Sequence, residues 1–146
     1  MKLCIHHIIV VFVLSAICSA CASVNLADPN DDLAAKTFSV ADGKSNIYTY
    51  RNEDVILNTD VSIEVDGKKM GSTGPRTYIL ATVSPGKHTV VASGENTEKL
   101  EVTTEAGKNY FVWLEIRFGV VTNRGHLHLV PKEEGEKGVL DSKLVK

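Results

Sequence analysis

The sequence predicts an all-β fold: an antiparallel β-sandwich, immunoglobulin-like or similar, with about seven to eight short strands. Short apolar or alternating segments recur along the chain, and a turn signal follows roughly every dozen residues. No long segment with the apolar period of an α-helix separates them. The predicted strands are SNIYTYR, VSIEV, TYILATV, HTVVAS, KLEVTT, YFVWLEI and RGHLHLV.

The segment before these strands is typical of a lipoprotein signal peptide, residues 1–20. Lys2 supplies a positive start, residues 8–17 form the apolar run, and small residues follow. A membrane-spanning helix needs about 20 apolar residues, so this shorter run indicates a signal and not a span. We therefore expect the remainder of the chain to be exported.

Cys21 is the predicted lipid attachment site. Ser19 and Ala20, both small, precede it, which favours cleavage between Ala20 and Cys21. Cys18 follows a larger side chain, so cleavage before it is disfavoured, although Cys18 also stands where a lipoprotein signal usually has leucine. The alternative is an ordinary signal-peptidase site with small residues at Ala20 and Ala22, which would release a soluble secreted protein.

Residues 21–33 are predicted to be the lipidated N-terminus followed by a flexible tether. The segment ASVNLADPNDDL is polar and acidic and contains Pro29. If flexible, a segment of this length spans on the order of 20 Å, which would hold the following domain away from the membrane. Residues 34–146 are then the β-sandwich domain with a charged C-terminal tail.

The strands of this domain are defined by their alternation and by the turns that follow them. VSIEV alternates apolar and polar residues, and Asp66-Gly67 follows directly as a strong hairpin signal. YFVWLEI is the most apolar segment and contains Trp113. In the tail, Pro131 can open a short helix, but Gly135 and Gly138 argue against a long one.

Six aromatic side chains stand out within the predicted strands. They are Tyr48, Tyr50, Tyr78, Tyr110, Phe111 and Trp113. An exposed set would indicate a binding surface. We expect burial instead, because a tryptophan in a central strand is often part of the core.

Five blocks of the sequence, taken in order, resemble a family of short bacterial envelope lipoproteins known only as domain of unknown function twenty-eight forty-six. The blocks are IYTYR, VDGKKMG, VSPGKHTV, TTEAGKNYFVWLEI and LVPKEEGEKGVLDSKL. The resemblance covers about residues 34–146 and implies a lipid-anchored periplasmic β domain of Gram-negative bacteria. It brings no activity, cofactor or catalytic residue. Ser142 stands where family members often carry a cysteine, so any role of that cysteine is absent here.

His126 and His128 are the weak candidates for a metal site. Separated by one residue, they project from the same face of the strand RGHLHLV. A metal site needs a third and usually a fourth ligand, and the candidates for these are His88, Glu115 and Glu133. The other interpretation, which we favour, places both histidines on the solvent face of a strand whose leucines face the core.

The rest of the composition argues against catalysis and nucleic-acid binding. No G-x-S-x-G, G-x-G-x-x-G or P-loop motif occurs, and the formal net charge is −2 with no basic cluster. We therefore predict a protein that is not an enzyme, does not bind nucleic acid, and has no cofactor other than a covalent lipid on Cys21.

The expected function is that of an outer-membrane lipoprotein that faces the periplasm and whose β domain binds or supports another envelope component, a protein or a glycan. Ala22 follows Cys21, and in the host that the resemblance implies, an aspartate at that position would favour the inner membrane instead. Two alternatives remain open: a periplasmic metal-binding protein that uses His126 and His128, and a small envelope enzyme that acts on a glycan or lipid.

Overall fold

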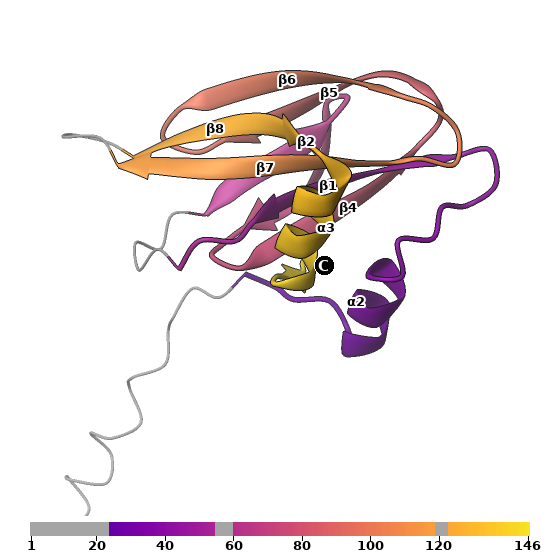
Figure 1. The fold of residues 1–146 in the computed structure, drawn as a ribbon. Coiled ribbons are helices and arrows are strands. Elements are labelled where there is room, and N and C mark those ends of the chain that lie inside the picture. The colour runs from indigo at the N-terminus through magenta and orange to yellow at the C-terminus, as the bar shows by residue number, and fades with distance from the viewer. Residues whose placement is uncertain (1–23, 55–59, 119–122) are drawn as a thin grey trace, which may run out of the picture.

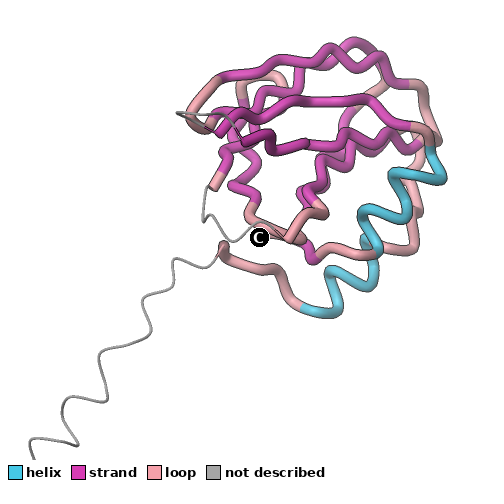
Figure 2. Tube along the Cα trace, turned by 60° about the vertical axis from the view of Figure 1, so that its left-hand side comes forward, coloured by secondary structure: helices cyan, strands magenta, loops and turns pink. Residues whose placement is uncertain are grey.

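The structure, a computed structural model, describes residues 24–54, 60–118 and 123–146. Its strands form a five-stranded sheet in the order β8-β7-β1-β4-β9 and a four-stranded sheet in the order β3-β2-β5-β6. The two sheets pack face to face, and helices α2 (Pro29–Ala35) and α3 (Lys132–Leu140) lie on the outer side of the five-stranded sheet (Figures 1 and 2). The predicted all-β sandwich is confirmed.

All seven predicted strands are present with nearly the predicted bounds. The five-stranded sheet contains β1 (Ser45–Arg51), β4 (Thr77–Val83), β7 (Asn109–Phe118), β8 (Asn123–Val130) and β9 (Lys143–Leu144). The four-stranded sheet contains β2 (Val61–Val65), β3 (Lys68–Thr73), β5 (Gly86–Ser93) and β6 (Thr97–Thr104). β3 and β9 were not predicted. The five-stranded sheet is also mixed rather than purely antiparallel, because β1 pairs in parallel with β7, and β4 with β9.

An aliphatic core fills the space between the sheets. It includes the fully buried side chains of Ile47, Ile63, Val90, Val102 and Leu114. Strand alternation brings these residues from both sheets to one layer. Burying each such side chain stabilises the fold by roughly 1.5–3 kcal/mol.

An aromatic core lies on the other face of the five-stranded sheet. Tyr48, Tyr50, Tyr78 and Phe111 are buried there, and the ring of Phe38 packs edge-on against Tyr48 at a centroid distance of 5.4 Å. Burial raises the pKa of Tyr48 and of Tyr50 to about 12. These phenols are therefore neutral packing groups. The expected burial of the aromatic residues holds for these four, while Tyr110 and Trp113 are half-buried.

Helix α3 (Lys132–Leu140) covers part of this aromatic core and approaches the sheet through two glycines. A Cβ atom on Gly135 would lie 2.2 Å from Cβ of Phe111, and one on Gly138 would lie 2.1 Å from Cε2 of Tyr50. The glycines that argued against a long helix are thus what allows this short helix to lie directly on the aromatic rings.

The prediction of a flexible tether over residues 21–33 is wrong for its described part, residues 24–33. Leu26 forms a β-bridge with Val145, and the N–H of Ala27 donates to the carbonyl of Leu144 at 2.9 Å. Helix α2 (Pro29–Ala35) follows immediately. This segment is therefore part of the folded domain.

Helix α2 has the local features of a helix start. Asp28 is its N-cap and accepts a hydrogen bond from the N–H of Asn30 at 2.8 Å. Pro29 occupies the first turn, where its missing N–H costs nothing. Neither helix of the described residues has the length and apolar character needed to cross a bilayer.

Candidate functional site

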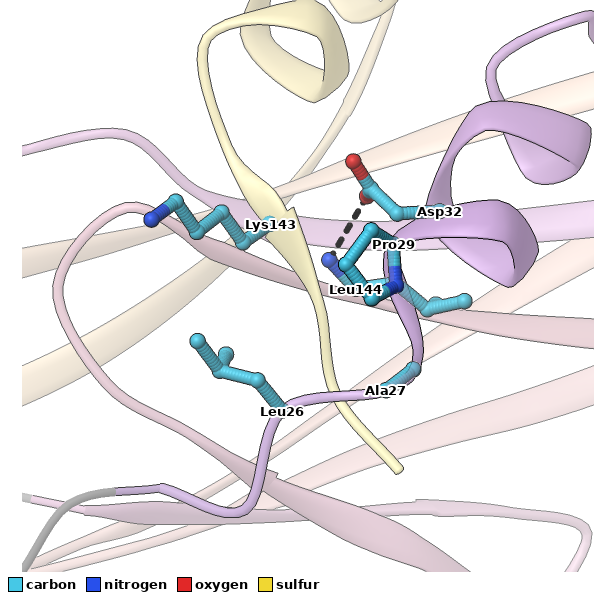
Figure 3. A pocket seen from close by; sticks show the side chains of 6 residues that line it. All are labelled: Leu26, Ala27, Pro29, Asp32, Lys143 and Leu144. Carbon is cyan, nitrogen blue, oxygen red and sulfur yellow. Dashed lines mark hydrogen bonds between the residues drawn. The ribbon is translucent and has the colours of Figure 1, made fainter.

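A pocket of about 320 Å³ lies where the segment leading into α2 meets β9. The residues that line it are Leu26, Ala27, Pro29, Asp32, Lys143 and Leu144 (Figure 3). Most of these side chains are apolar. In Figure 3, Leu26 and Lys143 extend to one side of β9, while Pro29 and Asp32 lie on the other.

A ladder of backbone hydrogen bonds fixes the walls of this pocket. On one side of β9, the N–H of Lys143 donates to Arg76 O and that of Val145 to Tyr78 O, each at 2.9 Å. On the other side, the N–H of Lys146 donates to Asn25 O at 2.8 Å. The C-terminal strand is therefore held between β4 and residues 25–27, so the pocket is built on paired backbone.

Asp32 connects α2 to β9 through both carboxylate oxygens. Its Oδ1 accepts the N–H of Leu144 at 2.9 Å, and its Oδ2 lies 2.8 Å from Nζ of Lys36. Nζ of Lys36 also donates to the carbonyl of Ser142 at 2.7 Å. Burial acts to raise the pKa of Asp32, but the hydrogen bonds from Lys36 and Leu144 outweigh it and hold the pKa below its usual value. The carboxylate is thus charged at neutral pH and committed to structural contacts.

The stability contributed by Asp32 should depend on pH. Its pKa is lower in the folded than in the unfolded state, where it is about 3.9, so the contribution is complete above the unfolded value and is lost as pH falls through the folded value. The variant Asp32→Asn keeps the shape of the side chain and one hydrogen-bond acceptor but removes the charge. Urea unfolding should give a constant gap in the free energy of unfolding between wild type and Asp32→Asn from about pH 7 to 5, shrinking from about pH 4 to 2. A gap that does not change with pH would contradict this electrostatic role.

The pocket can receive an apolar group. Leu26 and Leu144 supply apolar walls, and the ammonium group of Lys143 lies at the exposed rim. Since the carboxylate of Asp32 is already bonded on both oxygens, it is not placed as a general acid or base for a bound molecule. The arrangement is suited to binding.

The histidines lie on one face of β8, as predicted, and each lies beside a carboxylate. Nε2 of His128 is 3.0 Å from Oε2 of Glu115, and the imidazole ring lies 5.4 Å from the ring of Trp113. Nδ1 of His126 is 3.8 Å from Oε1 of Glu98, which the sequence did not indicate. The structure thus places one of the proposed third ligands, Glu115, beside His128 alone.

The other proposed ligands lie elsewhere. His88 bonds to Oδ2 of Asp66 and to the carbonyl of Ser84, each at 2.7 Å, and Glu133 is in the first turn of α3. Over residues 24–54, 60–118 and 123–146, no group of three or more His, Cys, Asp or Glu side chains is arranged to hold a metal ion. The metal hypothesis therefore has no ligand set in the part of the chain that the structure describes.

In the part of the chain that the structure describes, β8 is an edge strand of the five-stranded sheet. Leu127 is buried as predicted, but the prediction that Leu129 faces the core is wrong, because the side chain of Leu129 is 51% exposed. Asn96, in the turn between β5 and β6, bonds the β8 backbone twice: its Nδ2 donates to Gly125 O at 2.9 Å, and its Oδ1 accepts the Gly125 N–H at 2.8 Å. Sequence reasoning had no signal for this contact, since it depends on how the two sheets meet.

The predicted cleavage site and lipid attachment site, Ala20 and Cys21, lie outside the described residues. The pocket begins at Leu26, close in sequence to that site. Sequence reasoning did not find the pocket, because its walls come from a segment that was expected to be a linker and from a two-residue strand.

Comparison with known proteins gives a family and no activity. Residues 41–126 match the family described as "Protein of unknown function (DUF2846)". The chain is also similar to a protein of Haemophilus influenzae (strain ATCC 51907 / DSM 11121 / KW20 / Rd) that carries the name "Uncharacterized protein", with 32% identity over 123 residues, covering 83% of this chain and 73% of the relative. No solved structure gives a significant match. The resemblance found in the sequence is therefore confirmed: the chain belongs to the DUF2846 family.

Proposed function

We propose that this protein is a lipid-anchored outer-membrane lipoprotein whose β-sandwich is a non-catalytic binding or structural domain facing the periplasm. The apolar run of residues 8–17 and the small residues before Cys21 support the anchor. The observation that carries the proposal furthest is that the folded domain already includes Val24, three residues after Cys21.

This short separation sets how far the domain can stand from a lipid on Cys21. At about 3.3–3.6 Å per residue, three extended residues span roughly 10 Å. The pocket and α2 would therefore lie next to the lipid headgroups, instead of about 20 Å away as a flexible tether would allow. The anchor would orient the domain as well as retain it.

The side chains near this point suit a membrane surface. Leu26 is 43% exposed and Leu33 is 66% exposed, and both belong to the segment that follows Cys21. Lys143, in β9, and Lys146, after that strand, are both exposed and supply positive charge beside this segment. Exposed leucines at this position can rest against the lipid headgroups.

The lipid itself would provide the binding energy. A lipidated cysteine carries a diacylglycerol thioether and an amide-linked acyl chain. At about 0.8 kcal/mol per buried CH₂, one chain alone holds a protein marginally, whereas several chains hold it stably. The domain is then free to bind a further envelope component, a protein or a glycan.

Intact mass of the protein purified in detergent from host membranes tests this proposal. Wild type should have a mass that begins at Cys21 plus a lipid increment, and Cys21→Ala should lose both the increment and the membrane association, because the thioether cannot form. Cys18→Ala is the matched control and should give the wild-type mature mass, since Cys18 would leave with the signal peptide. A wild-type mass that begins at Ser23 without lipid would overturn the proposal.

A further inference from the structure

Strand β4 is paired along its full length on one side and only at its start on the other. Towards β1, Thr77–Val83 pair with Ser45–Arg51. Towards β9, only Thr77 and Tyr78 have partners, and residues 25–27 pair with the other side of the same C-terminal segment. Among the described residues, Leu80–Val83 are thus an open edge of the five-stranded sheet.

Alternation along the strand decides which backbone groups face this open edge. The carbonyls of Arg76 and Tyr78 accept hydrogen bonds from the β9 side, so the even-numbered residues of this strand turn their N–H and C=O groups that way. Asn46, which lies opposite Thr82, donates its N–H to Lys108 O on the side of β1 that faces away from β4. The Asn46–Thr82 pair is therefore not hydrogen-bonded through its backbones, which agrees with this alternation. Leu80 and Thr82 therefore present their N–H and C=O groups at the open edge.

A groove lies on each face of this edge. On the outer face, a cavity of about 320 Å³ lies between α2 and the sheet, with Ala34, Tyr48, Leu80 and Thr82 among its lining residues. On the inner face, a cavity of about 210 Å³ lies between β4 and the β2–β3 hairpin, with Val65, Met70, Ala81, Thr82 and Val83 in its lining. Thr82 lines both cavities, so the two grooves flank the same stretch of backbone.

We propose that the open edge at Leu80–Val83 binds an extended peptide segment of a partner protein as an added β-strand, with its alternate side chains in the two grooves. The exposed N–H and C=O groups of Leu80 and Thr82 require an extended backbone as their complement, and this requirement selects a peptide strand over a lipid surface. Successive side chains of a strand point to opposite faces, which matches one groove on each side.

The residues that line the grooves indicate which side chains the bound peptide should have. The inner groove is lined by Val65, Met70 and Val83 together with the charged Asp66 and Lys68. Its apolar part takes an aliphatic side chain of about valine or leucine size. The outer groove has both apolar and polar lining residues, Leu80 and Asp31 among them, and so takes a small side chain or a polar donor. The segment must also lack proline where its N–H bonds the edge.

Amide hydrogen exchange of the free full chain tests whether the edge is open. The N–H groups of Leu80 and Thr82 should exchange much faster than those of Ile79 and Ala81, which bond to β1. Equal protection of all four would show that the edge is already closed and would overturn the proposal. This measurement needs no variant and does not depend on the lipid anchor.

A proline variant tests the binding itself. Thr82→Pro removes an N–H that faces outward, a position where an edge strand tolerates proline, and Thr82→Val is the matched control that keeps the backbone group. The probe is a phage-displayed library of random dodecapeptides, selected on the wild-type full chain. Selected peptides should bind Thr82→Pro at least about tenfold more weakly than wild type, and Thr82→Val within about threefold.

The bound peptides should also slow the exchange of the Leu80 and Thr82 N–H groups. Peptides that bind Thr82→Pro as well as wild type, or that leave both N–H groups unprotected, would overturn the proposal. So would a wild-type dimer in sedimentation that Thr82→Pro dissociates, because the edge would then bind a second copy of this chain and not a different partner.

Discussion

Replacing Gly135 by alanine should destabilise the protein by about 3 kcal/mol, at the upper end of the usual cost of overpacking. Alanine is the better helix former by about 1 kcal/mol, so local propensity alone predicts the opposite sign. The packing decides it. The added Cβ would lie 2.2 Å from Cβ of Phe111, an atom that the β7 backbone fixes and that no rotation of the ring can move. Helix α3 would have to move off the sheet.

Urea unfolding of Gly135→Ala beside Lys137→Ala measures this effect. Lys137 is exposed on the same helix, so its replacement should change the free energy of unfolding by no more than about 0.5 kcal/mol. A second arm uses Gly138→Ala, whose Cβ meets the ring of Tyr50 and should therefore be partly rescued by Tyr50→Leu. If Gly135→Ala is neutral or stabilising, the helix does not lie as close to Phe111 as the structure places it.

The positions of the strands can be predicted from the sequence, because each strand depends on a local alternation of apolar and polar residues. VSIEV forms β2 with alternating burial, and Asp66 and Gly67 have φ values of 52° and 76°, which is the hairpin turn that the Asp-Gly pair predicts. The parallel pairing of β1 with β7 has no such signal, since the two strands are far apart in the chain. Burial on both faces of β1 is likewise hidden in SNIYTYR, where polar residues occupy part of the strand.

The segment around Pro29 explains why the candidate pocket was missed. Asp28, Pro29 and two further acids form the start of α2, but the same residues are typical of a polar linker. What distinguishes the helix from a linker is the contact of Asp32 with the N–H of Leu144, which is more than a hundred residues away in sequence. A helix this short is stable only through such tertiary contacts, which the local sequence does not encode.

For the histidines, the sequence predicts the position in the strand but not the contacts. Their common face follows from strand alternation and is confirmed. Their partners do not follow, because Glu98 reaches His126 from the other sheet and Glu115 reaches His128 from the neighbouring strand. A pattern of ligand-type residues therefore indicated a face of the molecule but not the chemistry on it.

Replacing Glu53 by alanine should cost about 3 kcal/mol, because it removes a partner from a buried cation. Arg51, at the end of β1, has a side chain that is 0% exposed, and its Nε lies 2.7 Å from Oε1 of Glu53. Removing Glu53 weakens the compensation of a charge that burial has already deprived of water, which is costlier than removing both members of the pair. The double variant Arg51→Met/Glu53→Ala should therefore recover much of the loss.

The free energies of unfolding of the two single variants and the double variant, measured in urea, form the cycle that isolates this coupling. Asp54→Ala is the control, since Asp54 pairs with Arg76 at an exposed position where solvent screens the charges, and it should be close to neutral. If Glu53→Ala destabilises the protein no more than Asp54→Ala does, Glu53 is not what balances the buried guanidinium. If the double variant is instead less stable than Glu53→Ala, the packing of the arginine stem, and not its charge, dominates at the end of β1.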